Sequence, residues 1–422
     1  SKVENKLKTE FEKIVRPDEP EKKNKAKQFI AFSDSRQAAA FYSSYLTTSY
    51  NSILYRRLIL EAMKNVNDCD CSAEIFAEKV YDVLHDNNVK CKAESYEKEK
   101  VLKEAWKAVY SELVDNNGST SLCSMGLLGI DADVRGKYDL YKITEKEFRD
   151  ICSVFAMSML ADAAISHDKT PLNDFDLEDF THGGAKSAYT LSDSTGKLRK
   201  SFLPSRDGLS NKRIDYIQRI IAEKCRKNSG IKEPDYDTIR RFLEAIWNRF
   251  FIAANGLALP KKNGGNSYEI NPQKIRVYAP KDAYICSKCK KITTHNVENV
   301  CPSYRCDGEL QPIDCKEIFA DNHYFNIYNN LDIRDLRVVE HTAQLDRDTA
   351  YDYQKRFKQK QIDVLSCSTT FEMGVDVGSL ETVFMRNMPP LPSNYAQRAG
   401  RAGRSSQSAA FALTFCNKSS AL

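Results

Sequence analysis

Two stretches that alternate short apolar strands with helices lie at opposite ends of this 422-residue chain, and they restrict its fold more than any other feature. In the first, "QFIAFSDSRQAAAFYSSYL", an apolar strand at Phe29–Phe32 runs into a polar turn and an alanine-rich helix, for which Asp34 or Ser35 is a suitable N-cap. Alternation of this kind returns near residue 320. The sequence therefore predicts an α/β fold, with one parallel sheet split by a mainly helical insertion of roughly 270 residues.

The second stretch contains several expected elements. The strands are "HYFNIYN", "LRVVEHTAQL", "IDVLSCST", "LETVFMRN" and "AAFALTFC", and the helices are "DRDTAYDYQKRFKQ" and "SNYAQRAG". Within the insertion, apolar residues recur at a spacing near 3.6, which is typical of helices. A helix followed by two β-prone runs around Gly264 and Gly265 resembles the end of a winged-helix module, and an ordinary α+β insert is the alternative.

These observations predict six regions. They are an N-terminal helix and linker at 1–27, the first part of the sheet domain at 28–47, a helical insertion at 48–234, the winged-helix element at 235–280, a four-cysteine zinc module at 281–318 and the remainder of the sheet domain at 319–422.

Composition limits the functional classes. The net charge of +5 is small for this length, so a nucleic-acid contact requires local basic patches. No apolar run approaches the roughly 20 residues that span a bilayer, and no signal-peptide pattern is present, so we expect no membrane association. Nine of the 13 cysteines are scattered, which favours a reducing, cytoplasmic compartment. Both ends of the sequence read as though cut from a longer protein.

One group of cysteines has metal-ligand spacing. In "CSKCKKITTHNVENVCPSYRC", Cys286 and Cys289 form a CxxC pair, and Cys301 and Cys306 follow within the same segment. Two short cysteine turns supply the four soft ligands that tetrahedral zinc prefers, with no position left open for a substrate. The prediction is a structural Zn²⁺; free thiols in a loop are the alternative. His295 lies in the intervening loop, but four cysteines already suffice.

The segment "QRAGRAGR" holds several arginines next to glycines. On a helix, Gln397, Arg401 and Arg404 would fall at i, i+4 and i+7 and share one face, with Arg398 to the side. Permanent planar cations beside a backbone thinned by glycine suit a polyphosphate. The alternative is a basic, solvated helix end, which explains neither the glycines nor the glutamine.

Another candidate segment, "STTFEMGVDVG", follows a buried strand. Ligands of α/β sheets bind at the carboxyl ends of strands, where Gly374 would allow close backbone approach and Asp376 would accept a hydrogen bond from a sugar hydroxyl. Taken alone, this segment fits a capped turn between strands equally well.

The order "FIAFSDSRQAA", "VVEHTAQLD", "STTFEMGVDVG" and "YAQRAGRAGR" resembles the motifs of the second RecA-like lobe of superfamily 2 helicases, including motifs IV, V and VI. The resemblance covers about 28–47 and 320–416, less than half of the chain. The cysteine segment "CPSYRCDGEL", with "NHYFNIYNN" and "EHTAQLDRDTA", is further similar to bacterial helicases with an MrfA-type zinc-binding domain, such as those of the DISARM and Druantia phage-defence systems.

This resemblance implies roles for individual residues. Arg401 and Arg404 would reach the γ-phosphate of ATP, one of them as an arginine finger, and Gln397 would place the nucleotide or the attacking water. Gly374, Asp376 and Arg398 would contact the nucleotide. Residues in turns that face the nucleic-acid backbone in relatives are Ser33, Asp34, His341, Thr342 and Thr369.

The resemblance also exposes what the sequence lacks. There is no GxxxxGK[ST] and no DEAD or DEAH box, so ATP and Mg²⁺ are expected only with an N-terminal RecA-like lobe of the same protein. The leading interpretation is part of an ATP-dependent DNA helicase or translocase, with partner proteins of a defence system. An RNA helicase and a non-catalytic, zinc-containing binding module are the alternatives.

A basic stretch in the insertion raises a separate question. Residues 197–227 hold ten Lys or Arg against three acidic residues, an excess of seven that exceeds the net charge of the whole chain. Both a nucleic-acid contact and an ordinary solvated surface fit this composition.

Overall fold

The computed structural model describes residues 28–66, 71–138, 141–178, 187–192, 199–228, 235–262, 264–342, 345–368, 380, 382–403 and 411–416. None of the helices in these ranges combines the length and the hydrophobicity that a membrane span requires. The chain divides into two compact units, the first formed by residues up to 54 together with those from 330 onward, and the second by residues 55–329.

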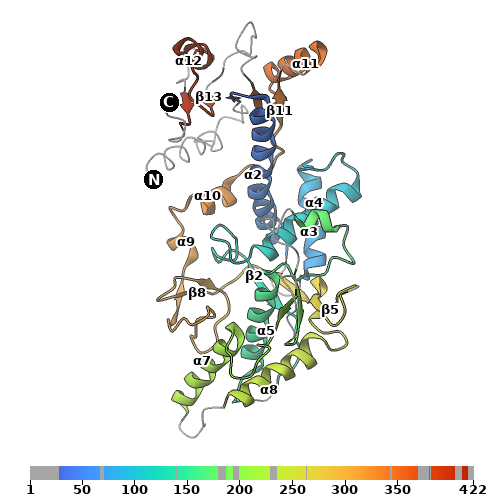
Figure 1. The fold of residues 1–422 in the computed structure, drawn as a ribbon, viewed down its shortest axis with the longest axis vertical. Coiled ribbons are helices and arrows are strands. Elements are labelled where there is room, and N and C mark those ends of the chain that lie inside the picture. Colours follow the sequence, from blue (N-terminus) through green and yellow to red (C-terminus); the bar gives the residue numbers. More distant parts are fainter. Residues whose placement is uncertain are drawn as a thin grey trace. The chain divides into compact units, whose positions relative to one another are not determined.

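Parallel strands from both ends of the chain form the sheet of the first unit. Their order is β11 (Val338–His341), β12 (Val364–Cys367), β1 (Phe29–Phe32), β13 (Thr382–Met385) and β14 (Phe411–Thr414). The central strand β1 pairs with β12 on one side and β13 on the other, so in Figure 1 the blue start of the chain joins strands drawn in orange and red. The predicted RecA-like parallel sheet, split by an insertion, is confirmed.

Helices cover both faces of this sheet. Alternate residues of β1 belong to two different clusters, with Phe29 and Ala31 in one and Ile30 and Phe32 in the other. Leu46 of α2 (Arg36–Met63) packs in the first cluster, whereas the second contains Phe357 of α11 (Arg347–Lys358) and is flanked by Tyr395 of α12 (Pro392–Ala399). Burial on both faces explains why the central strands are continuously apolar.

Local capping fixes where these helices begin. The Ser35 hydroxyl accepts a hydrogen bond from the backbone N–H of Ala38 at 3.1 Å, so Ser35 caps α2. Asp346 caps α11 by accepting from the N–H of Thr349, and Pro392 occupies the first turn of α12.

One expected strand is a helix. "HYFNIYN" lies in α10 (His323–Asn330), so the prediction of a strand there is wrong. Tyr324, Ile327 and Tyr328 fall at i, i+3 and i+4, and Ile327 and Tyr328 are buried. This spacing places one apolar stripe on a helix, and the aromatic content of the segment hid that signal.

The second unit is a helical body with three small sheets. Its helices are α3 (Ala73–Asp86), α4 (Lys98–Val114), α5 (Glu145–Leu160), α6 (Asp174–Glu178), α7 (Lys212–Lys227), α8 (Tyr236–Ile246), which continues as a π-helix at Trp247–Phe251, α9 (Cys315–Ile318) and most of α10. The sheets are β2 (Gly129–Ala132) with β7 (Ile275–Tyr278), β4 (Arg199–Ser201) with β3 (Ala188–Thr190), β6 (Tyr268–Ile270) and β5 (Ala258–Pro260), and β10 (Leu310–Ile313) with β8 (Ala283–Cys286) and β9 (Ile292–Thr293).

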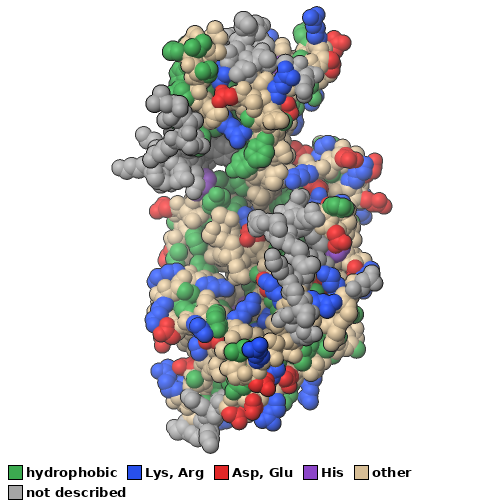
Figure 2. Space-filling view, in the orientation of Figure 1, with side chains coloured by type: hydrophobic (Ala, Val, Ile, Leu, Met, Phe, Trp, Pro, Cys, Tyr) green, Lys and Arg blue, Asp and Glu red, His purple; other side chains and the backbone are tan. Residues whose placement is uncertain are grey.

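The predicted hairpin after α8 is present, because β5 and β6 pair in antiparallel fashion on either side of Gly264 and Gly265. β6 also pairs with β3, which joins the hairpin to a larger sheet. Whether this region is a winged-helix element stays a prediction. On the face drawn in Figure 2, basic and acidic side chains are interspersed, in keeping with the small net charge.

Candidate functional site

The carboxyl ends of β1 and β13 bring polar residues together in the first unit. Asp34 follows β1, and its carboxylate lies 3.6 Å from Nη1 of Arg398 on α12. The amide of Asn387, which follows β13, donates to the same carboxylate at 2.6 Å. Sequence reasoning missed Asn387, although its position just after an expected strand was a usable signal.

Arg398 is an internal residue of this unit. Its side chain is fully buried, and the guanidinium carbon lies 5.5 Å from the centre of the Phe32 ring. A buried arginine needs a charge partner, and Asp34 supplies one. The expected contact between Arg398 and a nucleotide therefore stays a prediction, whereas its contact with Asp34 is present.

The expectation that one helix carries both Gln397 and Arg401 is wrong. Helix α12 ends at Ala399, with Gly400 as its C-cap, and Gly403 has a φ of +83°. Glycine adopts this left-handed conformation without strain, so the chain turns away after the helix. Gln397 is exposed at the last turn of the helix, whereas Arg401 is buried in the turn that follows.

That turn is attached to the sheet domain. The backbone N–H of Gly403 donates to the carbonyl of Leu380 at 2.9 Å, and Ala402 bridges to Leu380. Arg401 lies near the end of β12, close enough to oppose the rise in the pKa of the Cys367 thiol that burial causes. The structure thus brings Arg401 to the strand edge by a turn and not along a helix.

Three other residues expected to contact nucleic acid on this edge are buried. Ser33 is fully buried, and its N–H donates to the carbonyl of Cys367 at 2.9 Å. His341, the last residue of β11, and Thr342, which follows it, are also buried. Burial lowers the pKa of His341, so its ring is neutral at pH 7. Four expected site residues lie outside the described residues, namely Thr369, Gly374, Asp376 and Arg404.

The four cysteines of the second unit converge as predicted. The Sγ atoms of Cys286, Cys289, Cys301 and Cys306 all lie within 4.8 Å of one another. Two of these separations, Cys286 to Cys306 and Cys289 to Cys301, are 3.6 Å. A tetrahedral site with metal–sulfur bonds of about 2.3 Å places its sulfurs about 3.8 Å apart, so the cluster fits a metal ion held by four thiolates.

An arginine from another element supports the second cysteine pair. Arg219 of α7 donates to the carbonyls of Cys301 at 2.7 Å and Cys306 at 2.6 Å. Its guanidinium is held in turn by Asp215, at 2.8 Å on the same helix. Backbone carbonyls fixed in this way keep the two cysteines in position, which is the usual function of residues around a metal site.

His295 is not a ligand of this cluster. Its ring is buried between Asp131 at 3.6 Å and Asp150 at 3.5 Å, and Nε2 lies 3.0 Å from the carbonyl of Ile130. Burial alone would lower the pKa of His295, but the hydrogen bond with Asp150 and the two carboxylate charges outweigh it and raise the pKa. The histidine therefore joins the cysteine module to β2 and α5.

Replacing His295 by alanine is expected to lower the thermal midpoint by about 5–10 °C near pH 6, because it leaves two carboxylates facing an empty space. The raised pKa means that the imidazolium contributes its full stabilisation below the unfolded pKa of about 6.5, and that this is lost as the pH rises through the folded value. The difference from the parent chain should therefore shrink near pH 8.5.

Circular dichroism melts at the two pH values test this expectation. His85 is an exposed histidine on α3 of the same unit, so His85→Ala is the matched control and should leave the midpoint nearly unchanged. A His295→Ala deficit that is the same at both pH values would show that the ring contributes through packing and not through its charge.

Three cations of the basic stretch serve the interior of the second unit. Arg213 is buried, 4.5 Å over the Phe202 ring, and Lys224 pairs at 2.9 Å with both Glu147 and Glu298. With Arg219 on the cysteine loop, these cations are accounted for by internal contacts. Acidic partners far away in the sequence therefore neutralise part of the local charge excess.

Comparison with known proteins finds relatives for part of this chain. Residues 284–406 match the family described as the helicase conserved C-terminal domain. "Druantia protein DruE" of Escherichia coli (strain UMEA 4076-1) is 46% identical over 103 residues, which are 21% of this chain and 6% of that protein. An "ATP-dependent helicase Lhr-Core" of Sulfolobus acidocaldarius is 26% identical over 141 residues, which are 32% of this chain and 15% of that protein.

Among solved structures, "Mss116p DEAD-box helicase domain 2 bound to an RNA duplex" has 26% identity, covering 22% of this chain and 37% of that chain, with a TM-score of 0.19. The matched segments span only a small part of the length of the curated relatives. The chain carries the second RecA-like lobe of a superfamily 2 helicase and is related to the Druantia protein.

Proposed function

We propose that this chain is the second motor lobe of an ATP-dependent DNA helicase or translocase, with an insertion that contains a zinc module. The observation that carries the proposal is the helicase-type segment after α12, where Arg401 is buried in a turn whose next residue, Ala402, bridges to Leu380. Because burial already restricts this guanidinium, it loses little conformational entropy on acting, as a residue that stabilises a transition state requires.

In this proposal, Arg401 and Arg404 stabilise the charge that develops during phosphoryl transfer, and Gln397 positions the nucleotide or the water. Gly374 and Asp376 contact the ribose side. Bound ATP and Mg²⁺ supply the chemistry, and they are held mainly by a first RecA-like lobe.

Arg398 has an additional positioning role in the proposal. Its contact with Asp34 joins α12 to the turn after β1. A displacement of one of these segments would therefore move the other. This contact would couple the arginine segment to the turn that follows β1.

Nucleic-acid contacts are proposed for the same edge of the sheet. Residues in the turns after β1, β11 and β12 would hold phosphates through backbone N–H groups and short polar side chains, and they are Ser33, Asp34, His341, Thr342 and Thr369. Because Asp34 is negatively charged and Ser33 is buried, backbone N–H groups are better suited to phosphate in that turn than the side chains, apart from the Ser33 N–H that donates to Cys367.

We propose DNA over RNA from the resemblance to the helicases of the Druantia and DISARM phage-defence systems. That relation also motivates a role in phage defence, with DNA repair as the other setting, in the cytoplasm and with partner proteins of such a system. An RNA helicase is the second candidate, because contacts to the backbone do not by themselves separate the two nucleic acids. A non-catalytic zinc-containing binding module is the third.

Phosphate release by the longer helicase, which includes the first lobe, tests the function. Single-stranded DNA should raise its ATP turnover to about 1 s⁻¹ or more, and RNA of the same length should raise it less. The 422-residue chain alone should release no phosphate above background with either nucleic acid, because this sequence contains neither phosphate-gripping motif.

Three results would change the proposal. Stronger stimulation by RNA would favour the RNA helicase. A longer protein without ATP turnover under either condition would favour the non-catalytic module. Turnover by the 422-residue chain alone would show that its own residues bind and hydrolyse ATP.

A further inference from the structure

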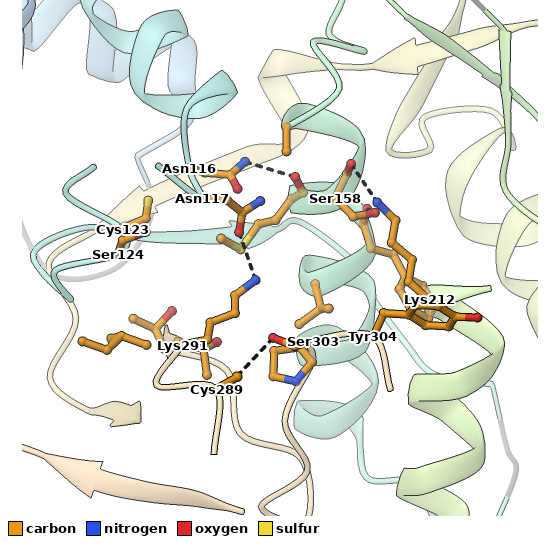
Figure 3. A pocket seen from close by; sticks show the side chains of 18 of the residues that line it. Asn116, Asn117, Cys123, Ser124, Ser158, Lys212, Cys289, Lys291, Ser303 and Tyr304 are labelled. Carbon is orange, nitrogen blue, oxygen red and sulfur yellow. Dashed lines mark hydrogen bonds between the residues drawn. The ribbon is translucent and has the colours of Figure 1, made fainter. Parts of the chain in front are cut away.

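A cavity in the second unit is not explained by the motor function. It has a volume of about 650 Å³ and lies between α5, the start of α7 and the cysteine module, as Figure 3 shows. This volume is within the range of small-molecule sites. All its lining residues belong to residues 55–329, so the cavity is a feature of that unit alone.

The lining is strongly cationic. Its charged members are four cations and one carboxylate, namely Lys212, Arg213, Lys290, Lys291 and Asp162, and Cys289 lines it as a thiolate of the metal cluster. The carboxylate is already engaged, because Asp162 accepts from Lys200 at 2.5 Å and from the Tyr189 hydroxyl at 2.5 Å. The cavity therefore keeps an excess of positive charge.

Two lysines of the lining make no ion pair among the described residues. Nζ of Lys291 donates to Oδ1 of Asn117 at 2.9 Å, and Nζ of Lys212 lies 3.5 Å from the carbonyl of Ser158. In Figure 3 they extend from different elements, Lys291 from the cysteine module and Lys212 from the start of α7. Asp162 attracts Lys212, and the sulfurs of Cys289 and Cys301 attract Lys291. Neither lysine has an acidic hydrogen-bond partner among the described residues, so both ammonium groups can still bind an anion.

The setting of Lys212 is consistent with this. Its side chain is accessible, yet protein surrounds it, and this partial desolvation together with the charge of Arg213 lowers the pKa to about 8. An ammonium group held near other cations gains more from an anionic ligand than one on an open surface.

An aromatic ring lies at the same cavity. Tyr304, between the second pair of cysteines, is 44% exposed, and the guanidinium carbon of the exposed Arg305 lies 5.0 Å from the centre of its ring. An accessible aromatic face is a platform on which a nucleobase stacks. Cations for a phosphate and a ring for a base together match the two halves of a nucleotide.

We propose that this cavity binds a nucleotide, with Lys212 and Lys291 on the phosphate and Tyr304 against the base. The phosphate comes either from a nucleic-acid strand or from a free nucleotide. This site is separate from the motor lobe, and it stands or falls independently of ATP turnover.

Binding to the metal-loaded full chain tests the proposal with three probes: a fluorescein-labelled oligothymidylate of about 12 nucleotides, AMP and inorganic pyrophosphate. Replacing both lysines, as Lys212→Ala with Lys291→Ala, should lower the affinity for the bound probes about tenfold at low salt. The matched control is Arg226→Ala, an exposed cation of the same helix that lies outside the cavity, and it should change affinity less than about twofold.

Tyr304→Ala separates the two halves of the ligand. This substitution should lower the affinity for the oligonucleotide or for AMP about fivefold or more. The affinity for pyrophosphate, which has no base, should not change. If the variants lose affinity for the oligonucleotide and AMP does not compete with it, the ligand is a nucleic-acid strand. If the variants lose affinity for AMP, the ligand is a free nucleotide.

Lysine acetylation read by mass spectrometry locates the site, so binding elsewhere on the chain does not obscure the result. The bound probe should protect Lys212 and Lys291, while the exposed Lys64 stays equally reactive. No protection of either lysine, or an equal loss of affinity in the Arg226→Ala control, would overturn the proposal, as would a double variant that binds every probe like the parent chain.

Discussion

Arg401→Ala and Arg404→Ala are each expected to reduce ATP turnover of the longer helicase by roughly 10³-fold or more, while ATP binding stays nearly unchanged. The first lobe would hold the nucleotide in the open state, and the arginines would act only when the lobes close. They would therefore stabilise mainly the transition state, and the loss should fall on kcat more than on KM.

The side-chain chemistry sharpens this expectation. Lysine at either position should restore little activity, because an ammonium cannot make the planar two-pronged contact of a guanidinium. The double variant should be only slightly worse than either single one, since both residues serve the same closed state. Single-turnover hydrolysis and nucleotide titration separate these effects.

Folding must be controlled separately for Arg401, because its side chain is buried. Thermal melts of Arg401→Ala and Arg401→Lys show whether the unit remains intact. Arg356 on α11 is partly exposed, and its contacts with Asp352 and Tyr353 lie on its own helix, so Arg356→Ala is a matched control that should retain normal turnover. Near-normal ATPase together with weaker DNA binding in Arg404→Ala would instead make these arginines nucleic-acid contacts.

Removal of the metal should be the largest change in the second unit. We expect about one zinc per chain, and apparent folding contributions of structural zinc reach about 10–16 kcal/mol in small modules. Cys301→Ser should lose most of the metal, because the Sγ of this buried residue is one of the four that converge. Chelation should expose the loop that Arg219 holds by its carbonyls.

Metal analysis and hydrogen exchange check this result. Cys315 lies just beyond β10 but outside the cluster, so Cys315→Ser should keep a full equivalent of zinc. Full zinc in Cys301→Ser would mean that the ligand set is wrong, and an unchanged exchange pattern after chelation would mean that the metal does not hold the module together.

The sequence by itself determined the features that depend on neighbouring residues. Apolar runs such as Phe29–Phe32 and Val364–Cys367 predict buried strands, and both are central strands of the sheet. Ser35 was among the expected caps because capping needs only a side-chain oxygen immediately before the first helical residue. The cysteine cluster was predictable because four ligands within one short segment can reach a common point with a small loss of chain entropy.

The tertiary structure decided what depends on residues far apart in the sequence. Arg398 meets Asp34 only because the sheet brings β1 and α12 together. Lys224 is neutralised by Glu147 and Glu298 from other elements, which no local charge count reveals.

The same reason explains the remaining differences. His295 reads as a spare ligand in the sequence, but the fold encloses it between two carboxylates that lie more than a hundred positions earlier. The cavity combines α5, α7 and the cysteine module. Periodicity and spacing report contacts within a few turns of chain, whereas burial and charge pairing are set by which distant surfaces pack together.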